Sequence, residues 1–210
     1  MEKVNKTEKF WDRLANRFDK RAGHFERTYN QTVENTQKHL HAGDIVLDYG
    51  CATGEVAIEI AGDVKEVHGI DISSKMIAAA KSKAAERKIK NVDFTYTTIF
   101  VEGFKKESFD VILALNILHL VEDTQKVIQR INELLKPGGL IVSATACMGE
   151  KKSFINILIF LLTKMRIIPC MKFFEISELK DSITNGNFQI VEAESLNQSG
   201  TEYFIAAKKI

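Results

Sequence analysis

Two short runs in the middle of the sequence carry residue types that suit the binding of a nucleoside. The first is DYGCATG at positions 48–54, between a β-branched run and a helical pattern. Gly50 permits a sharp turn without a Cβ clash, and the small Ala52 and Gly54 let a ligand approach the backbone closely. The helix that follows is expected to present unpaired N–H groups at its N-terminus.

The second run is GID at positions 69–71, where the next apolar run ends. Asp71 lies about twenty residues beyond the turn, the spacing at which an acidic side chain meets ribose hydroxyls in doubly wound nucleoside sites. A carboxylate accepts both hydroxyl protons of a cis-diol, whereas it would repel a 2′-phosphate. Either run alone is weak evidence, because a strand-end aspartate can simply be solvated. Together and in this order they predict a nucleoside site.

A parallel sheet is needed to bring the two runs together, and the sequence after Gly43 alternates between strand and helix patterns as such a sheet requires. The predicted strands are 45–47, 64–72, 92–96, 109–115 and 140–146, and the predicted helices are 55–61, 73–88 and 124–135. Ser73 is a suitable N-cap, and Lys-Pro-Gly-Gly at 136–139 cannot continue a helix. The alternation predicts an α/β fold with a doubly wound, mostly parallel, Rossmann-like sheet.

The two ends of the chain show different patterns. The first forty residues predict two amphipathic helices with a break at Gly23, the second running from Phe25 to Leu40. Residues 151–186 are predicted to be mainly helical. Strands at 189–193 and 203–207, separated by a turn at 197–200, complete a seven-stranded sheet with an antiparallel last strand.

We interpret the chain as one domain. Its predicted parts are a helical lid (1–42), a cofactor-binding core (43–146), a helical insertion or acceptor wall (147–186) and closing strands (187–210).

Composition narrows the class of protein. The 210 residues are about one domain, and 45% apolar with 27% charged residues is typical of a globular chain. With 29 basic and 28 acidic residues the net charge is +1, which supplies no concentrated basic face, so no nucleic-acid partner is expected. Cys51, Cys147 and Cys170 are scattered, which predicts neither disulfides nor a metal site. Because the N-terminus lacks the apolar run of a signal peptide, a cytoplasmic location is expected.

One apolar segment, Phe154 to Leu162, is too short to span a membrane. It predicts either a helix that faces the core or a hydrophobic surface element. Peripheral membrane contact through residues 154–174 follows from the second interpretation.

The two runs and their surroundings resemble the class I S-adenosylmethionine-dependent methyltransferases. The resemblance is close over residues 45–146 and looser over the closing strand at 203–208. Residues 48–54 are similar to the family's first motif and residues 69–71 to its acidic-loop motif. FDVI at 109–112, with Asn116 and His119, resembles the fourth-strand motif. LLKPGG at 134–139 is similar to the turn before the fifth strand, which is a structural marker.

The resemblance implies a role for each matching residue. Gly50 and Gly54 would pass beneath the methionine part of the cofactor, with Asp48 orienting its ammonium group. Asp71 would hold the ribose diol, and Asn116 would lie near the methionine moiety.

The adenine would lie between other residues. Ile72 and Met76 would pack on its faces. The sequence departs from the family at Ala52, which replaces a glycine, and after the third strand, where an acidic residue is frequent. Thr98 would there accept the bond from the adenine amino group, and the backbone of Ile99 would serve a ring nitrogen.

The activity implied is in-line transfer of a methyl group to a small, hydrophobic acceptor, leaving S-adenosylhomocysteine. Such a transfer requires alignment and exclusion of water more than a catalytic triad. His119 is the candidate base, against the alternative of a packing or capping histidine. The acceptor pocket is predicted to involve aromatic residues of the helical lid, although such stripes are more often core. These residues are Trp11, Phe18, Phe25 and Tyr29.

Three other functions remain open. A nicotinamide-dependent oxidoreductase would require Gly-x-Gly-x-x-Gly, which Gly50, Ala52 and Gly54 do not supply. A non-catalytic regulatory domain would bind the adenosyl group and transfer nothing. A protein or nucleic-acid methyltransferase is the third, and residues 115–118 read LNIL, where amino-directed nucleic-acid enzymes often carry an Asn-Pro-Pro-Tyr-like run. The sequence leaves the acceptor and the oligomeric state open.

Overall fold

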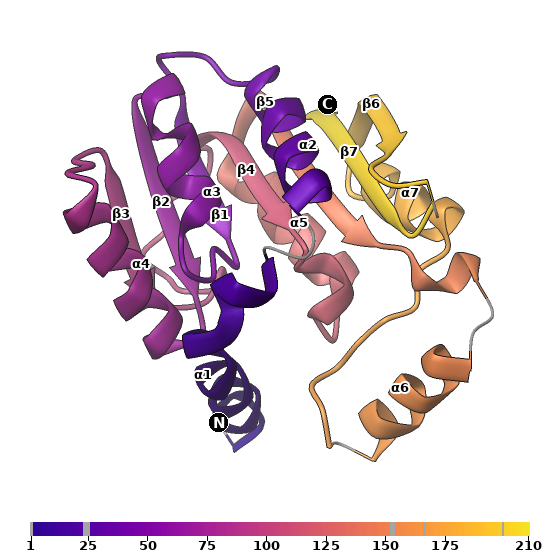
Figure 1. Cartoon of the computed structure of the whole chain (residues 1–210). Helices are drawn as coiled ribbons and strands as arrows, with labels where there is room; N and C mark the ends of the chain where they lie inside the picture. The colour runs from indigo at the N-terminus through magenta and orange to yellow at the C-terminus, as the bar shows by residue number, and fades with distance from the viewer. Residues whose placement is uncertain (1, 23–25, 152–153, 166, 199) are drawn as a thin grey trace.

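The computed structural model describes residues 2–22, 26–151, 154–165, 167–198 and 200–210. A single sheet runs through the molecule, with helices on both of its faces (Figure 1). The strands are β1 Ile45–Tyr49, β2 Glu66–Asp71, β3 Val92–Tyr96, β4 Phe109–Leu115, β5 Leu135–Ala146, β6 Phe188–Ser195 and β7 Glu202–Lys209. The helices are α1 Glu2–Ala22, α2 Glu26–Gln37, α3 Glu55–Glu59, α4 Ser74–Glu86, α5 Thr124–Leu134, α6 Phe154–Lys164 and α7 Ile176–Thr184. Short 3-10 turns are η2 Ile60–Asp63, η3 Leu118–Leu120 and η4 Met148–Glu150.

The strand order is β3-β2-β1-β4-β5-β7-β6. Strands β1 to β5 are parallel, and β7 is antiparallel to both β5 and β6. The predicted seven-stranded, mostly parallel sheet with an antiparallel last strand is therefore confirmed. Because β7 runs in the opposite direction, its first residues lie at the edge where the parallel strands end, and Glu202 pairs with Ala146.

Side chains of successive strand residues point to opposite faces, so the sheet separates two apolar clusters. One cluster contains Leu47 and Ile112 and packs under α5 and α7, with contributions such as Ile131 and Ile183. The other contains Val46, Val111, Phe204 and Ala206 and packs against α3 and α4, with contributions such as Ile58 and Ile77. Burial on both faces explains why β4 is an almost unbroken apolar run.

The start of β5 differs from the prediction. The strand begins at Leu135 and not at Leu140, so residues 136–139 belong to it and do not form a separate turn. Pairing passes from Phe109 with Leu135 to Val111 with Leu140, which leaves extra residues bulged out of the ladder. The bulge accommodates Pro-Gly-Gly, which a regular strand would exclude. Nζ of Lys136 donates to the two carboxylate oxygens of Asp110 at 2.8 and 2.7 Å and fixes the start of the strand.

Several predicted helix boundaries also move. The prediction that residues 151–186 are mainly helical is correct for α6 and α7 but wrong for residues 167–175, where Pro169 disfavours helical backbone. The second helix ends at Gln37, before the predicted Leu40. The predicted break at Gly23 and the side chain of Phe25 lie outside the described residues.

The turn between β1 and α3 has left-handed backbone at three positions, Gly50, Ala52 and Gly54. Gly54 has φ +76°, and a Cβ there would lie 2.5 Å from Cζ of Phe94 and 2.8 Å from Cβ of Ala80. The protein's own packing therefore requires this glycine, whereas the sequence suggested room for a ligand. Ala52 has φ +47° and keeps its side chain in a region that disfavours residues with a Cβ.

We expect Gly54→Ala to lower the free energy of unfolding by about 2–4 kcal/mol, because it combines left-handed strain with a clash in the core. Urea denaturation measures the loss. Ala52→Gly is the matched control, since it removes strain from the neighbouring left-handed position and should leave stability unchanged or raised. Equal stability of Gly54→Ala and the unaltered protein would contradict this packing.

Candidate functional site

The first and second strands end side by side and are joined through their backbones. The N–H groups of Gly50 and Cys51 donate to the Ile70 carbonyl at 2.8 and 3.0 Å. Gly50 has φ +77°, and a Cβ there would lie 2.9 Å from Cγ1 of Ile117, just after β4. The glycine thus serves both the sharp turn and the close approach of the chain that leaves β4.

Asp71 at the end of β2 holds this turn in place. Its Oδ2 accepts from the Ala52 N–H at 3.1 Å, and its Oδ1 accepts from the Ser73 N–H at 2.7 Å. Burial raises the pKa of Asp71 above its ordinary value despite these bonds. An ionised carboxylate offers about four lone-pair positions, so both oxygens retain capacity for further donors such as a vicinal diol.

The N–H groups of the turn are largely occupied within the protein. Those of Gly50, Cys51 and Ala52 donate as described, and that of Gly54 donates to the Cys51 carbonyl at 2.9 Å. These four groups precede α3, which begins at Glu55, so the expectation of unpaired N–H groups at the helix N-terminus stays a prediction. Free N–H groups in such a turn are what binds a phosphate, and the four engaged groups are not available for one.

Asp48 lies beneath the turn and is 3% exposed. Burial, followed by the charge of Asp71, raises its pKa from 3.8 to about 7. Tyr29 of α2 belongs to the same neighbourhood: burial and then the charges of Glu55 and Glu59, with a smaller contribution from Asp48, raise its pKa to about 12. The charge of the predicted cofactor residue Asp48 thus acts on the predicted acceptor residue Tyr29.

A third carboxylate comes from α1 and was not predicted. Oδ1 of Asp12 accepts from Oγ of Ser73 at 2.6 Å and from the Lys75 N–H at 3.2 Å. The negative charge lies at the N-terminus of α4, where the helix dipole favours it. It also contributes to the raised pKa of Asp71. Because 61 residues separate Asp12 from Ser73, no local pattern in the sequence could reveal the contact.

Helix α1 is held against α4 by this contact, and Figure 1 shows its free end beyond the sheet. Trp11 and Phe18 are partly buried on it, and the Trp11 ring meets Phe10 edge-on with centroids 5.2 Å apart. The two predicted acceptor residues on α1 therefore share a helix with Asp12.

The predicted adenine residues lie between β2, α4 and the end of β3. Ile72 and Thr98 are partly exposed, whereas Met76 and Ile99 are almost wholly buried. The Met76 N–H donates to Oγ of Ser73 at 3.2 Å, which confirms Ser73 as the N-cap of α4. The Ile99 carbonyl accepts from Nε of Arg130 at 3.2 Å and is already engaged.

Two predicted residues follow β4. Asn116 is exposed, has φ +55° and donates its N–H to the Ala144 carbonyl at 2.7 Å. His119 is buried in η3, and burial lowers its pKa from 6.5 to about 4. Within the described part of the chain its Nδ1 has no hydrogen-bond partner. The imidazole is therefore neutral at pH 7 but a weak base, which disfavours general-base catalysis in this state.

The structure thus brings Asp48, Gly50, Asp71 and the unpredicted Asp12 together at the edge where the parallel strands end. In the described ranges, no group of three or more His, Cys, Asp and Glu side chains is arranged to hold a metal ion.

Residues 40–165 match a family described as a methyltransferase domain. The chain belongs to this family. Its membership covers more than half of the chain and includes every residue of the turn, the acidic strand end and the β4 terminus. The resemblance to class I S-adenosylmethionine-dependent methyltransferases is therefore confirmed.

Related methyltransferases share about half of this chain. Phosphoethanolamine N-methyltransferase 2 of Caenorhabditis elegans is 36% identical over 101 residues, which are 48% of this chain and 23% of that protein. A 27-O-demethylrifamycin SV methyltransferase of Amycolatopsis mediterranei (strain S699) is 40% identical over 103 residues, 48% of this chain and 38% of that protein. The chain thus spans less than half the length of these two relatives.

A solved structure shows the same fold. Phosphoethanolamine N-methyltransferase 2 of Haemonchus contortus, in complex with phosphomonomethylethanolamine and S-adenosylhomocysteine, superposes with a TM-score of 0.72 at 19% identity. The match covers 86% of this methyltransferase-domain chain and 52% of that one.

The raised pKa of Asp48 predicts a pH dependence of stability. The folded protein binds this proton more tightly than the unfolded chain, whose ordinary value is 3.8. The contribution to stability is therefore complete below about pH 4 and is lost as the pH rises towards about 7. We therefore expect the free energy of unfolding, measured with urea, to fall less over this pH interval in Asp48→Asn than in the unaltered protein. An unchanged slope in that variant would contradict the burial of this carboxyl group.

The Asp12 contact predicts how α1 is held. Asp12→Ala removes the acceptor for two donors of α4 and should weaken the attachment by about 1 kcal/mol. Hydrogen exchange would then be several-fold faster along α1, with the strands unaffected. Arg13→Ala changes the exposed neighbour on the same helix and serves as the control. Equal protection in both variants would show that Asp12 does not hold α1.

Proposed function

We propose that this chain binds S-adenosylmethionine at the Asp48–Asp71 site and catalyses transfer of its methyl group to a small-molecule acceptor. When bound, the cofactor supplies a methyl group already activated by a positively charged sulfur. The protein's task is to hold the cofactor, align the acceptor behind the methyl group and exclude water.

The observation that carries the proposal is the charge of the site. The charges of Asp12, Asp48 and Asp71 interact. The charge of Asp71 contributes to the raised pKa of Asp48, and the charge of Asp12 contributes to the raised pKa of Asp71. Four N–H groups of the turn are also engaged within the protein, as described above. Such a site favours a nucleoside with a sulfonium and an ammonium group and disfavours a dinucleotide with a negative pyrophosphate. This argues against the nicotinamide alternative on physical grounds.

The roles of the cofactor residues follow from their positions. Asp71 would accept the ribose hydroxyls with the capacity left on its two oxygens. Asp48 would ionise beside the cofactor's ammonium group, which compensates the burial of the carboxylate. Asn116, with its left-handed backbone, would lie beside the methionine moiety, where Gly50 and Gly54 shape the turn.

The adenine would contact Ile72 and Thr98, whose side chains are accessible. Met76 and Ile99 would support these contacts from behind, because both are nearly enclosed.

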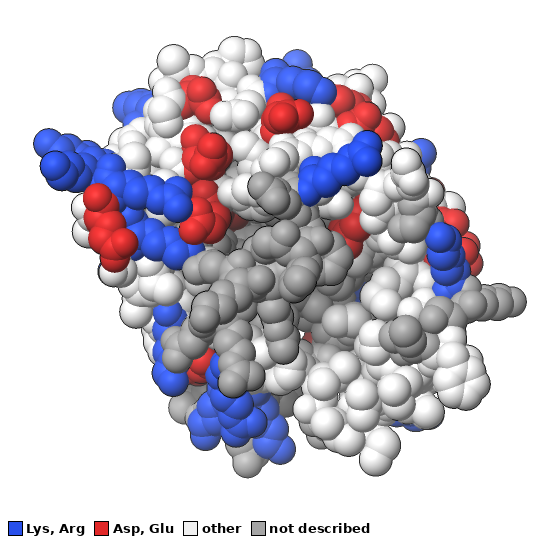
Figure 2. All heavy atoms as spheres, in the orientation of Figure 1, with Lys and Arg blue, Asp and Glu red and all other residues white. Residues whose placement is uncertain are grey.

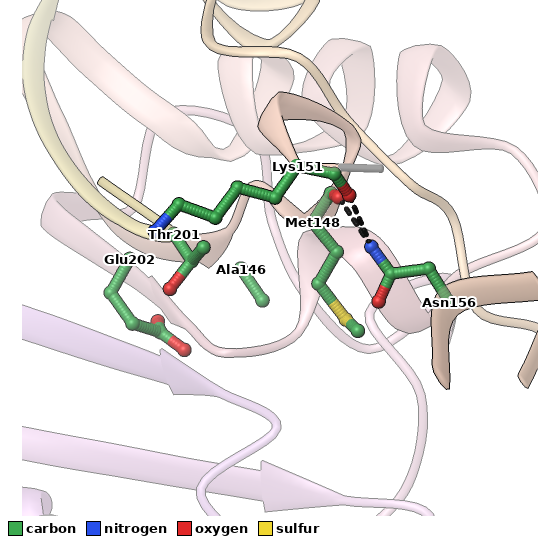
Figure 3. A pocket seen from close by; sticks show the side chains of 6 residues that line it. All are labelled: Ala146, Met148, Lys151, Asn156, Thr201 and Glu202. Carbon is green, nitrogen blue, oxygen red and sulfur yellow. Dashed lines mark hydrogen bonds between the residues drawn. The ribbon is translucent and has the colours of Figure 1, made fainter. Parts of the chain in front are cut away.

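A cavity of about 300 Å³ at the end of β5 is our candidate for the acceptor pocket (Figure 3). Ala146, Met148, Lys151, Asn156, Thr201 and Glu202 line it. It opens at the same sheet edge as the cofactor site, and β5 is two strands from β1, about 10 Å at the usual strand spacing. By strand alternation from Val46, Ala144 and Phe204, the side chains of Asp48, Ala146 and Glu202 point to the same face.

The lining of this cavity suggests an acceptor with both polar and apolar parts. Ala146 and Met148 offer apolar surface. Burial raises the pKa of Glu202, whose Oε2 has no partner within the described residues. Figure 3 shows Lys151 extended along the cavity with its ammonium group on the side of Thr201. On this proposal the insertion 147–186 would contribute an acceptor wall through Met148, Lys151 and Asn156.

Two further observations bear on the acceptor. The relatives named above are named for small molecules, phosphoethanolamine and a demethylrifamycin, which supports a small acceptor. Trp11, Phe18 and Tyr29 on α1 and α2 would close the site as a lid. A role of His119 as proton acceptor stays a prediction, and the proposal does not depend on it.

The test is a pair of substitutions at one position. Asp71→Ala should weaken S-adenosylhomocysteine binding by more than tenfold in calorimetry, because both the diol acceptor and the clamp on the turn are lost. Asp71→Asn keeps an acceptor of the same shape and should bind with intermediate affinity. Unchanged affinity in Asp71→Ala would contradict the ribose assignment.

Turnover is measured as S-adenosylhomocysteine formed from S-adenosylmethionine with a panel of amine, phenol and thiol acceptors. Binding without turnover across the panel would favour a non-catalytic regulatory domain. Thermal stabilisation by NAD but not by S-adenosylmethionine would overturn the proposal.

A further inference from the structure

Helix α6 presents its apolar side chains to solvent. Five of them follow the spacing i, i+3, i+4, i+7 and i+11, which places them on one side of the helix and its C-terminal extension. We name this set the α6 stripe: Phe154, Ile157, Leu158, Leu161 and Met165. Each is exposed, from 48% at Leu161 to 88% at Phe154. The alternative that this helix faces the core is therefore wrong for the α6 stripe.

The other side of α6 attaches it to the protein. Nδ2 of Asn156 donates to the carbonyls of Met148 and Lys151 at 2.8 and 2.7 Å. The ring of Phe160, which is itself 54% exposed, meets Phe173 edge-on, with centroids 6.4 Å apart. These contacts fix the orientation of the helix, so the α6 stripe points away from the body of the protein. In Figure 1 the helix stands at the end of two connecting segments, apart from the sheet.

Charge around the α6 stripe has one sign. Between positions 151 and 172 the sequence has no Asp or Glu, and its charged residues are Lys151, Lys152, Lys164, Arg166 and Lys172. The area over α6 in Figure 2 is almost entirely free of charged atoms, in contrast to the mixed surface elsewhere on that face. Lys151 lines the cavity and Nζ of Lys172 donates to Oγ1 of Thr124 at 2.9 Å, so the basic residues that flank the stripe in the sequence are Lys152, Lys164 and Arg166. An apolar stripe with basic residues at its ends is the pattern of a helix that lies in the interface of an anionic membrane.

We infer that the α6 stripe inserts into the surface of a bilayer that contains anionic lipids. In the described part of the chain, no helix combines the length and apolarity needed to cross a bilayer. The contact would therefore be peripheral. A second copy of the chain fits the same surface less well, because a symmetric contact would bring together two segments whose charged residues are all basic. The inference is independent of methyl transfer, since it rests on α6 alone.

The experiment uses the full chain and vesicles. The protein should sediment with vesicles of phosphatidylcholine and phosphatidylglycerol, and at least about tenfold less with phosphatidylcholine alone. Added salt should weaken the binding, because it screens the cationic flanks. No binding to anionic vesicles, or equal binding to both kinds, would overturn the inference.

Matched variants identify the surface. Leu161→Glu should reduce binding to anionic vesicles by at least about tenfold. Val191→Glu introduces the same charge at an apolar β6 residue of similar exposure, 52%, and should bind as the unaltered protein does. Lys164→Ala should reduce binding to anionic vesicles about fivefold. Lys90→Ala, at an exposed lysine before β3, should change this binding little.

Two outcomes would assign the surface otherwise. Equal vesicle binding by Leu161→Glu and Val191→Glu would show that α6 is not the contact. Dimerisation that Leu161→Glu abolishes, in a protein that binds no vesicles, would assign the α6 stripe to self-association. Circular dichroism and thermal unfolding of each variant separate these results from a loss of folding.

Discussion

The Asp71 carboxylate is the constraint on which the site depends. It accepts N–H groups from the turn after β1 and from the start of α4, so one side chain fixes the relative position of three elements. Parallel pairing of β1 with β2 places the carboxylate beside the turn, and the left-handed backbone at Ala52 points an N–H group at it. A nucleoside bound at this point would meet a preformed surface.

The same arrangement places carboxyl groups close together. Asp48 is buried and Asp71 is partly buried, and each has a raised pKa. A cation bound between them would relieve the repulsion and favour ionisation. The raised pKa values show that ionising these carboxyl groups costs free energy in the folded protein, as is usual where polar groups are assembled in a functional site. Asp12 adds to this charge but also docks α1, so the N-terminal helix and the site are linked through one residue.

The antiparallel direction of β7 brings its first residues to the edge of the sheet at which the parallel strands end. If β7 were parallel to β5, its first residues would lie at the opposite edge, far from the ends of β1 and β2. Because it is antiparallel, Glu202 pairs with Ala146 and lines the cavity beside the insertion. The insertion then has two surfaces with different chemistry. Asn156 lines the cavity, and the α6 stripe faces outward.

The sequence by itself determined the sheet, its mostly parallel order and the pairing of a glycine turn with Asp71, because strand period, buried runs and turn residues are local signals. It did not determine that Gly54 is required by Phe94, that residues 136–139 are a bulge within β5, or that Asp12 reaches Ser73. Each of these depends on contacts between residues distant in the sequence. The exposure of α6 was also decided only by the tertiary structure. The sequence of this helix is compatible with a buried or an exposed position, and only its packing shows which of its apolar side chains face solvent.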